Sequence, residues 1–312
     1  MAYNVAVDVG GTFTDVLVFN EETGELTEGK VLSTPEDPSK GVVTGIESVC
    51  EKVGIGFTDL NLLFHGTTVV TNMILTNTGS RVGLLTTKGH EQILYLARAW
   101  TPGPLYGWMA LQKPDPPADP TDTVGISERI GADGAVLTDL DENQVRQAVE
   151  SLVERGIEAL AIGFLNSYVN PDHERRVRDI ARELYPDLSV SISSDIGQEY
   201  GEYERTLTTV VNTAVQPRTM TYMRNFETSI AEKQFGGSLS IVRSDGGAMS
   251  TEAVSERPIQ IALSGPSGGV TGSAYLAREI EVPDILTFDM GGTSTDVSLC
   301  LGGETLIRRE MS

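Results

Sequence analysis

A short motif occurs twice in this chain. Residues 8–16 read Asp-Val-Gly-Gly-Thr-Phe-Thr-Asp-Val and residues 289–297 read Asp-Met-Gly-Gly-Thr-Ser-Thr-Asp-Val, so seven of nine positions agree across a separation of 281 residues. Each copy lies between two apolar runs, a pattern that predicts a strand, a Gly-Gly turn and a second strand. The chain is therefore expected to fold around two related β-hairpins.

The residue types of this motif are those that bind phosphate groups. Glycine lets backbone N–H groups approach phosphate oxygens closely, and threonine hydroxyls add hydrogen-bond donors. An aspartate that ends the first strand, Asp8 or Asp289, can hold Mg²⁺ or its waters. Tight-turn chemistry alone explains one copy of the motif, but not two copies with the same continuation. Two copies predict two lobes that face each other across one nucleotide.

A second aspartate follows in each copy of the motif, at Asp15 and Asp296. Each lies seven residues after the first aspartate. Because successive residues of a strand point to opposite faces, we expect the second aspartate on the opposite face from the first. Its role stays open between a structural partner of the turn and a site residue.

Composition excludes several classes of partner. The formal net charge is −21, from 23 basic and 44 acidic residues, and such a surface repels nucleic acid and anionic lipid. The longest apolar runs fall far below the ~20 residues of a membrane span. The first residues enter a strand without the basic segment and apolar core of a secretory signal, so we expect a cytoplasmic protein. Cys50 and Cys300 lie far apart and are expected to be free thiols.

The order of strands and helices predicts a layered α/β protein. Three strands are expected over residues 4–32 and a helix over residues 39–52, and helices and strands alternate between residues 141 and 192. A length of 312 residues favours two domains. We place them at residues 1–190, with the first hairpin, and at residues 191–312, which end just after the second hairpin.

Three further segments carry expectations of their own. Residues 90–98 are expected to be helical, and residues 202–233 to form a long helix that Pro217 can break. Residues 101–123 hold six prolines and are expected to be extended and irregular. This proline-rich stretch is either a surface connector or a loop that contacts a substrate or another subunit.

Two short sequences are candidates for chemistry outside the repeated motif. His65 ends a buried strand before Gly-Thr-Thr, where an imidazole beside hydroxyls can transfer a proton near neutral pH, although most lone histidines are not catalytic. Residues 264–269, Ser-Gly-Pro-Ser-Gly-Gly, fit the G-x-S-x-G pattern of serine hydrolases. No histidine follows His173, so the order of a hydrolase triad fails. We interpret residues 264–269 as a third loop that faces phosphate or substrate.

Several stretches, taken in order along the chain, resemble the hydantoinase/oxoprolinase family, and within it the A-type, ATP-using subunit of N-methylhydantoinase. They are residues 65–72, 163–168, 170–174, 202–205, 208–212, 264–270 and 288–297. The paired hairpins also resemble the superfamily of actin, sugar kinases and Hsp70, in which two ribonuclease-H-like lobes clasp Mg·ATP. The chain is similar to the N-terminal portion of such a subunit, so we expect its second lobe to be incomplete.

The resemblance implies a fold, cofactors and site residues. The implied fold is α/β, with ribonuclease-H-like ATPase lobes built on mixed sheets, and the implied cofactors are ATP and Mg²⁺. Asp8, Asp289 and His65 are the implied catalytic residues, and the first two are also the implied metal ligands. The implied phosphate-binding residues are Gly10, Gly11, Thr12, Thr14, Gly291, Gly292 and Thr293, together with Gly265, Ser267 and Gly268.

The resemblance also implies a function with open alternatives. The first is a subunit of an ATP-dependent cyclic amide hydrolase that opens hydantoin-type or 5-oxoproline-type rings by phosphoryl activation of the amide oxygen. The second is the equivalent subunit of an ATP-dependent ketone carboxylase, and the third is a non-catalytic nucleotide-binding fragment. The implied partners are a cyclic amide substrate and a B-type hydantoinase subunit in an oligomeric complex.

Overall fold

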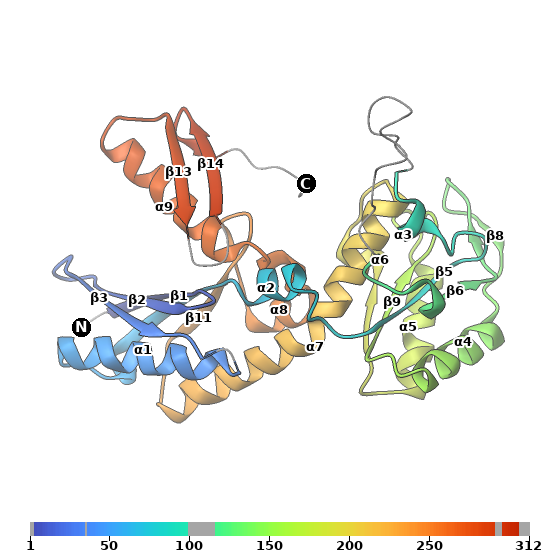
Figure 1. Ribbon diagram of the computed structural model, residues 1–312, viewed down its shortest axis with the longest axis horizontal. Helices are drawn as coiled ribbons and strands as arrows, with labels where there is room; N and C mark the ends of the chain where they lie inside the picture. The colour runs from blue at the N-terminus through green and yellow to red at the C-terminus, as the bar shows by residue number, and fades with distance from the viewer. Residues whose placement is uncertain (1–2, 35, 99–115, 291–294, 306–312) are drawn as a thin grey trace. The chain divides into compact units, whose positions relative to one another are not determined.

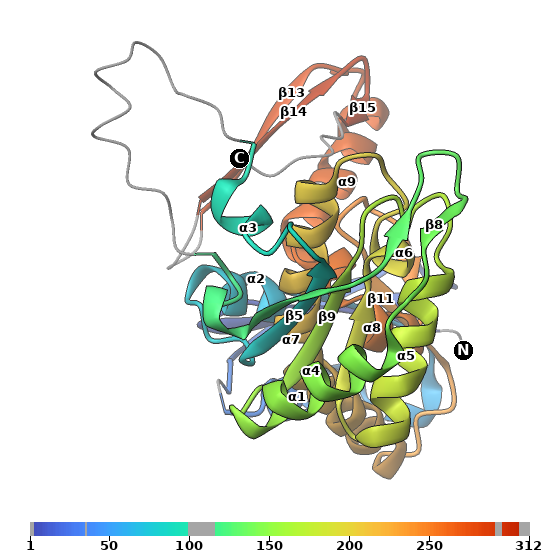
Figure 2. The same ribbon diagram turned by 90° about the vertical axis from the view of Figure 1, so that its right-hand side faces the viewer.

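The computed structural model describes residues 3–34, 36–98, 116–290 and 295–305 (Figures 1 and 2). Its contacts divide the chain into two compact units. The first unit holds residues 1–77 and 218–312, and the second unit holds residues 78–217. The structural division thus differs from the boundary near residue 190 that follows the sequence order, because the second unit is inserted between two parts of the first.

The first unit is built on a six-stranded mixed sheet in the order β12-β11-β4-β1-β2-β3. Its strands are β1 Tyr3–Val9, β2 Phe13–Asn20, β3 Leu26–Leu32, β4 Leu60–Thr67, β11 Ser238–Val242 and β12 Ala248–Met249. The strand β1 pairs antiparallel with β2 and parallel with β4. The three strands expected over residues 4–32 are therefore present, and they form one edge of this sheet.

Helix α1, Pro38–Val53, covers one face of that sheet. The Asp37 carboxylate caps its first turn by accepting a hydrogen bond from the backbone N–H of Ser39, and Gly54, at a φ of 76°, ends it. The buried side of β1 and β2 packs against the apolar stripe of α1 to form the core of the unit. This core includes Val5, Val7, Val9, Val16, Val18, Val42, Ile46 and Val49.

The close packing of α1 on the sheet depends on a residue without a side chain. A Cβ atom placed on Gly29 of β3 would lie 2.3 Å from Cγ2 of Val49 in α1, far inside van der Waals contact. Val49 is fully buried and β-branched, so it has little freedom to move away. Gly29 therefore sets the distance between helix and sheet.

We expect Gly29→Ala to destabilise the chain by about 1–3 kcal/mol, the usual cost of overpacking a core. The measurement is the free energy of unfolding from urea denaturation. Gly236→Ala is the matched control, because no atom lies within 4 Å of a Cβ at that position. Equal stabilities of the two variants would show that α1 can shift without cost.

The second hairpin lies in the same unit as the first and forms a three-stranded antiparallel sheet. Its strands are β13 Ile285–Met290, β14 Thr295–Leu301 and β15 Glu304–Thr305, and helix α9, Ser264–Glu279, packs against them. The two hairpins have the same register, since Asp8 pairs with Asp15 and Asp289 pairs with Asp296. The expectation of two related hairpins is confirmed.

Shorter helices complete the first unit. They are α2 Val69–Leu75, α8 Thr251–Glu256, and the 3-10 turns Phe57–Asp59 and Pro258–Ile261. The long helix α7, Glu202–Glu232, is continuous and contains Pro217, so the break that the sequence allows there does not occur. Its residues Phe226 and Ile230 join the core beneath β1 and β4.

The second unit contains a parallel sheet in the order β10-β9-β5-β6. Its strands are β5 Val82–Thr87, β6 Thr123–Ile126, β9 Ala159–Gly163 and β10 Ser189–Ile192, with a short hairpin of β7 Arg129–Ile130 and β8 Val136–Thr138. Its helices are α3 Ile93–Leu96, α4 Glu142–Glu154, α5 Asp172–Leu184, α6 Ser193–Ile196 and a 3-10 turn, Pro120–Asp122. The alternation expected between residues 141 and 192 is confirmed.

The central strands of this sheet are buried on both faces. Leu85 and Ile162 join a core with α4 and α5, whereas Leu84 and Ala161 join a second core with Val210 of α7. Parallel strands covered on two sides read as continuous apolar runs, as β9 does. The helix expected over residues 90–98 is shorter than predicted, because Ala97, at a φ of 51°, ends α3 after one turn.

Candidate functional site

Asp8 lies at the end of β1, and two glycines from other elements flank its carboxyl group in space. It is level with Gly66 on the neighbouring parallel strand β4. A Cβ on Gly66 would lie 3.2 Å from Oδ1 of Asp8, and a Cβ on Gly265, in the first turn of α9, would lie 2.8 Å from the same oxygen. The carboxyl group therefore lies against two glycines, and a Cβ atom added at Gly265 would force it to move. We call this arrangement the glycine slot.

The orientation of Asp15 corrects the expectation drawn from strand alternation. Asp8 and Asp15 are direct cross-strand partners, and direct partners of an antiparallel pair share a face. The odd spacing implies opposite faces only along an unbroken strand, and the turn between β1 and β2 reverses the chain. Lys30 of β3 pairs with Asp15, with Nζ 2.7 Å from Oδ1. Asp289 and Asp296 are partners in the same way.

The environment of Asp8 disfavours its charge. Protein atoms around the carboxyl group remove water from it although the residue keeps some exposed surface, and this desolvation is the largest cause that raises the pKa of Asp8. The charges of Asp15 and Asp289 raise this pKa further, and Lys30 opposes them. The aspartate of the second hairpin is thus close enough to act on the aspartate of the first. A cation beside these carboxylates would relieve their repulsion.

The turn of the first hairpin is fixed by Ser33, at the end of β3. Its hydroxyl donates to the carbonyl oxygen of Gly10 at 2.8 Å, and its backbone N–H donates to the carbonyl oxygen of Thr12 at 2.9 Å. The Thr14 hydroxyl lies 3.0 Å from the Ser33 hydroxyl and is fully buried. Gly11 and Thr12 are exposed at the turn, whereas Thr14 contributes to the inside of the hairpin.

The remaining predicted phosphate-binding residues fall into two groups. Gly291, Gly292 and Thr293 lie outside the described residues. Gly265, Ser267 and Gly268 form the first two turns of α9, so the loop expected over residues 264–269 is instead helical. The N–H of Ser267 donates to the carbonyl of Leu263 at 3.0 Å, which closes the first turn. The start of this helix lies directly against Asp8.

Ser264 is a residue of this region that sequence reasoning missed. Its buried hydroxyl accepts a hydrogen bond from the Thr67 N–H at 3.0 Å and donates to the Thr67 carbonyl at 2.8 Å. This pair of bonds joins the first residue of α9 to the last residue of β4. It fixes Gly265 beside the Asp8 carboxyl group. The serine stands inside the motif, but nothing in the sequence identifies Thr67 as its partner.

His65 lies on the opposite face of the sheet from Asp8. It is level with Val7 and faces the core, where it is fully buried and its ring contacts Phe226. Its Nε2 lies 2.6 Å from the hydroxyl of Tyr222, while Nδ1 has no hydrogen-bond partner within the part of the chain that the structure describes. Burial lowers the pKa of His65 to about 3, so the ring is neutral at physiological pH. The structure therefore does not bring His65 together with Asp8.

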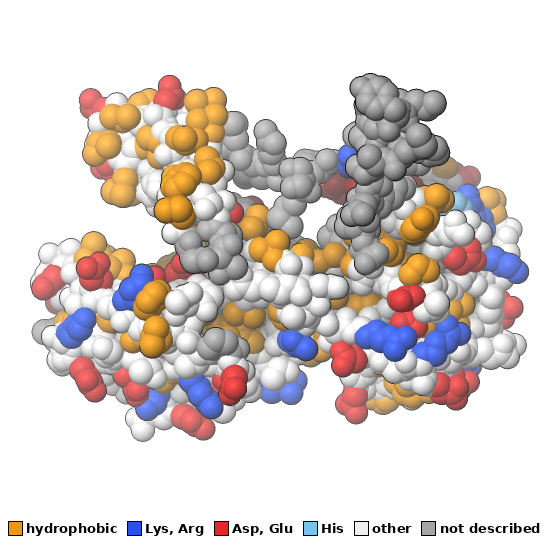
Figure 3. All heavy atoms as spheres, viewed as in Figure 1, with side chains coloured by type: hydrophobic (Ala, Val, Ile, Leu, Met, Phe, Trp, Pro, Cys, Tyr) orange, Lys and Arg blue, Asp and Glu red, His pale blue; other side chains and the backbone are white. Residues whose placement is uncertain are grey.

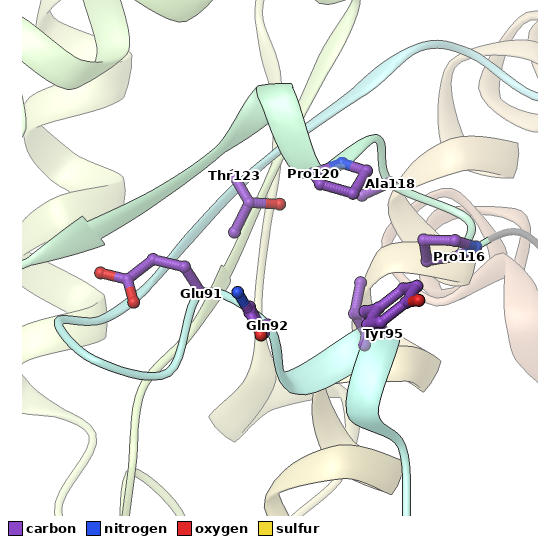
Figure 4. A pocket seen from close by; sticks show the side chains of 8 residues that line it. Glu91, Gln92, Tyr95, Pro116, Ala118, Pro120 and Thr123 are labelled. Carbon is purple, nitrogen blue, oxygen red and sulfur yellow. The ribbon is translucent and has the colours of Figure 1, made fainter.

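The second unit contains a cavity of about 250 Å³ (Figure 4). Its walls combine the apolar parts of Leu94, Tyr95, Pro116, Ala118 and Pro120 with Glu91, Gln92 and Thr123. The described end of the proline-rich stretch thus forms one wall of a cavity, and the rest of that stretch, residues 99–115, lies outside the described residues. No residue predicted as a site residue lines this cavity.

Two other features are absent from the described residues. None of their helices is long and apolar enough to cross a membrane. They contain no group of three or more His, Cys, Asp and Glu side chains arranged to hold a metal ion. Mg²⁺ usually takes only one or two carboxylates and completes its shell with water and phosphate oxygens. Asp8 and Asp289 offer ligands of that type.

The mixed sheet with its repeated hairpin defines the class of protein, a mixed α/β fold that is shared with a nucleotide-free acetone carboxylase structure. The chain belongs to the hydantoinase/oxoprolinase family. Residues 4–185 match the N-terminal region of hydantoinase/oxoprolinase proteins, and residues 205–312 match the hydantoinase/oxoprolinase domain. The fold and the family that the sequence predicts are confirmed.

Individual relatives agree with this assignment. A nucleotide-free acetone carboxylase structure matches with a TM-score of 0.88 and 28% identity, over 97% of this chain and 44% of that chain. The ATP-dependent caprolactamase of Pseudomonas jessenii matches with a TM-score of 0.81 and 29% identity, over 95% and 43%. The acetophenone carboxylase gamma subunit of Aromatoleum aromaticum is 34% identical over 95% of this chain and 42% of its own length. The chain therefore spans less than half the length of these relatives.

If Asp8 binds the cation of Mg·ATP, Gly265→Ala should weaken that binding and the turnover by about 10- to 100-fold, because a methyl group in the glycine slot displaces the Asp8 carboxyl group. Calorimetry on the chain and ADP release by the assembled enzyme are the measurements. Gly269→Ala is the matched control, since it lies in the same helix and has no atom within 4 Å of its added Cβ. Equal effects of the two substitutions would contradict the claim that a side chain at position 265 displaces the Asp8 carboxyl group.

Proposed function

We propose that this chain is the ATP-using part of an enzyme that activates a substrate oxygen by phosphoryl transfer, and that its substrate is a cyclic amide. The observation that carries the proposal is the position of Asp8. It lies in the glycine slot, beside the start of α9, and within electrostatic reach of Asp289 in the second copy of the same hairpin. Duplicated carboxylates with adjacent backbone donors suit the phosphate chain of a nucleotide with its cation.

The residues of the chain would divide the work as follows. Asp8 and Asp289 would hold Mg²⁺, which neutralises phosphate charge when it is bound. The exposed turn at Gly11 and Thr12 would direct its backbone N–H groups and hydroxyl toward phosphate oxygens. The start of α9 adds the positive end of a helix dipole near the same place. These groups position the nucleotide and stabilise charge, which is most of what phosphoryl transfer requires of a protein.

Phosphoryl transfer makes chemical sense for a cyclic amide. The amide carbon is a poor electrophile, and the ring nitrogen is a poor leaving group. When the amide oxygen attacks the γ-phosphorus and ADP leaves, the ring carbon becomes open to attack by water. The ring C–N bond then breaks as the nitrogen takes a proton, and a second water releases the phosphate from the acyl phosphate that remains. The matched relative from Pseudomonas jessenii is an ATP-dependent caprolactamase, which supports this choice of substrate class.

A ketone carboxylase is the second candidate, because two of the matched relatives are named as acetone and acetophenone carboxylases. ADP release by the assembled enzyme separates the two. A cyclic amide hydrolase is stimulated by hydantoin, 5-oxoproline or a lactam without added bicarbonate, whereas a carboxylase needs both a ketone and bicarbonate. Stimulation only by ketone with bicarbonate would replace the first proposal by the second.

A partner subunit is part of the proposal. Relatives that match nearly the whole of this chain are named as the alpha subunit of caprolactamase and the gamma subunit of acetophenone carboxylase. We infer that a B-type hydantoinase subunit completes the enzyme. Failure of Mg·ATP to bind to the chain by calorimetry would argue against the nucleotide role itself. Binding without turnover, whatever subunit is added, would favour a non-catalytic nucleotide-binding protein.

A further inference from the structure

His65 is an unfavourable residue for the place that it occupies. Its ring is fully buried and contacts Phe226 of the apolar core, and its Nδ1 has no hydrogen-bond partner within the described part of the chain. Figure 3 shows the Lys, Arg, Asp and Glu side chains of this unit spread over its visible surface, where polar groups are hydrated. An unpaired polar atom in a core costs free energy that an apolar side chain would avoid, which indicates a role besides packing.

The other ring nitrogen of His65 ends a chain of hydrogen bonds. Burial lowers the pKa of His65, so the ring is neutral and Nε2 can accept a proton from the Tyr222 hydroxyl, 2.6 Å away. The Tyr222 hydroxyl is also hydrogen-bonded to the side chain of Thr67. Thr67 Oγ1 accepts from the backbone N–H of Val69 at 3.2 Å, which leaves its own proton for Tyr222. One hydroxyl of α7 therefore holds two residues of β4 at once.

Gly66 lies between these two residues of β4 and forms one wall of the glycine slot. Because successive residues of a strand alternate in face, His65 and Thr67 point to the core while position 66 faces Asp8. A Cβ on Gly66 would lie 3.2 Å from Oδ1 of Asp8 and 3.7 Å from Cα of Gly265. The Tyr222 hydroxyl thus holds β4 on both sides of the residue that contacts the Asp8 carboxyl group.

The second wall of the slot depends on the same point of β4. The backbone of Thr67 makes two hydrogen bonds with the hydroxyl of Ser264, and Ser264 directly precedes Gly265. The N–H of Thr68 donates to the carbonyl of Val9 at 2.9 Å, which joins this point to the strand that carries Asp8. Both glycines of the slot are therefore placed by residues beside or bonded to Thr67, whose side chain Tyr222 holds.

We propose that Tyr222 and His65 are positioning residues, which fix the Asp8 carboxyl group in the glycine slot by holding β4 on both sides of Gly66. We call the hydrogen-bonded side chains of Tyr222, His65 and Thr67 the tyrosine clamp. The clamp gives His65 a positioning role in place of the catalytic role that the sequence implies. Its effect on a nucleotide rests on the function proposed above, whereas its effect on β4 does not.

Tyr222→Phe tests the clamp, because it removes one oxygen atom and leaves the aromatic ring in the core. Without nucleotide, we expect amide exchange at Thr67 to become about tenfold faster, since its side chain loses an anchor. With Mg·ATP, we expect the dissociation constant from calorimetry to rise about tenfold. Tyr3→Phe is the matched control and should leave both values unchanged. Tyr3 is 6% exposed and Tyr222 is 5% exposed in the same unit, but Tyr3 lies at the opposite end of β1 from Asp8.

Two further comparisons separate positioning from general stability. In an Asp8→Asn background, Tyr222→Phe should weaken Mg·ATP binding no further, because the group that the clamp positions is absent. His65→Gln offers an oxygen that can accept from Tyr222, so it should retain more affinity than His65→Leu.

The outcomes are distinguishable. Unchanged exchange at Thr67 in Tyr222→Phe would overturn the clamp, whether or not the chain binds nucleotide. Faster exchange with an equal loss of Mg·ATP binding in the Asp8 and Asp8→Asn backgrounds, or with no loss in either, would overturn the positioning role. Failure of the unsubstituted chain to bind Mg·ATP would count against the proposed function, and exchange at Thr67 would still decide whether the clamp exists.

Discussion

Asp8→Asn is expected to lower Mg-dependent ATP turnover of the assembled enzyme by about 100-fold or more, while it makes the unliganded chain more stable at neutral pH. The loss of turnover follows because an amide keeps the shape of the glycine slot but supplies no anionic ligand. The gain in stability follows because the carboxylate stands near Asp15 and Asp289 in a partly desolvated place. One substitution should thus move activity and stability in opposite directions.

The sign of the pH dependence follows from the raised pKa of Asp8. A carboxyl group whose pKa is higher in the folded state favours folding below its ordinary pKa, near 3.9, and this contribution is lost as the pH rises through the folded-state pKa. The advantage of Asp8→Asn should therefore be largest at pH 7 and vanish near pH 3. Thermal unfolding at both pH values measures it. Asp139→Asn, at an exposed position of the second unit, is the control. A variant with normal turnover, or one less stable at pH 7, would contradict the assignment of Asp8.

Glu174→Ala is expected to destabilise the second unit by about 3–5 kcal/mol, the usual cost of leaving buried partners of a charged group unpaired. Glu174 is fully buried in α5 and accepts hydrogen bonds from three donors at the ends of the parallel strands. They are the N–H of Phe164 at 2.8 Å, the hydroxyl of Ser193 at 2.6 Å and the N–H of Ser194 at 2.8 Å. Removal of the carboxyl group leaves two backbone donors without partners in the core.

Arg205 makes this loss larger. Its guanidinium donates to the Ser193 hydroxyl at 3.1 Å and to the Phe164 carbonyl at 2.9 Å, so it depends on the same two residues as Glu174. Urea denaturation gives the free energy of unfolding. Glu183→Ala, on an exposed position of the same helix, removes only surface ion pairs and should cost no more than about 1 kcal/mol. Similar costs for the two variants would show that the buried network contributes little.

The sequence predicts the hairpins well because the residues that determine each hairpin are neighbours in the chain. The Asp-x-Gly-Gly-Thr pattern and the flanking apolar runs determine strand, turn and strand, and the repetition carries over even to the register of Asp8 and Asp289. The parallel sheet of the second unit is equally readable, because helices and strands of ordinary length alternate there. Fold class therefore follows from periodicity and turn chemistry alone.

Other features depend on contacts between distant residues. The side of the hairpin on which Asp15 lies is set by chain reversal, and the helix over residues 264–269 is held to β4 by the bond between Ser264 and Thr67, 197 positions away. His65 is neutral in the core because α7 brings Phe226 and Tyr222 to it. The division into units is also non-local, since β11 pairs with β4 across the whole inserted unit. Local patterns do not encode these pairings.

The glycine slot also has a consequence for how this sequence can vary. Gly66 and Gly265 are restricted by the Asp8 carboxyl group and not by backbone strain, because neither has a positive φ. The substitutions that are tolerated at Asp8, Gly66 or Gly265 therefore depend on which residues occupy the other two positions. Gly265→Ala should be harmful when residue 8 is aspartate. It should be much less harmful when it is combined with Asp8→Gly, which removes the carboxyl group. A homologue without a carboxylate at position 8 should therefore accept other residues at both glycine positions. Homologues in which all three residues have changed are expected not to use this site.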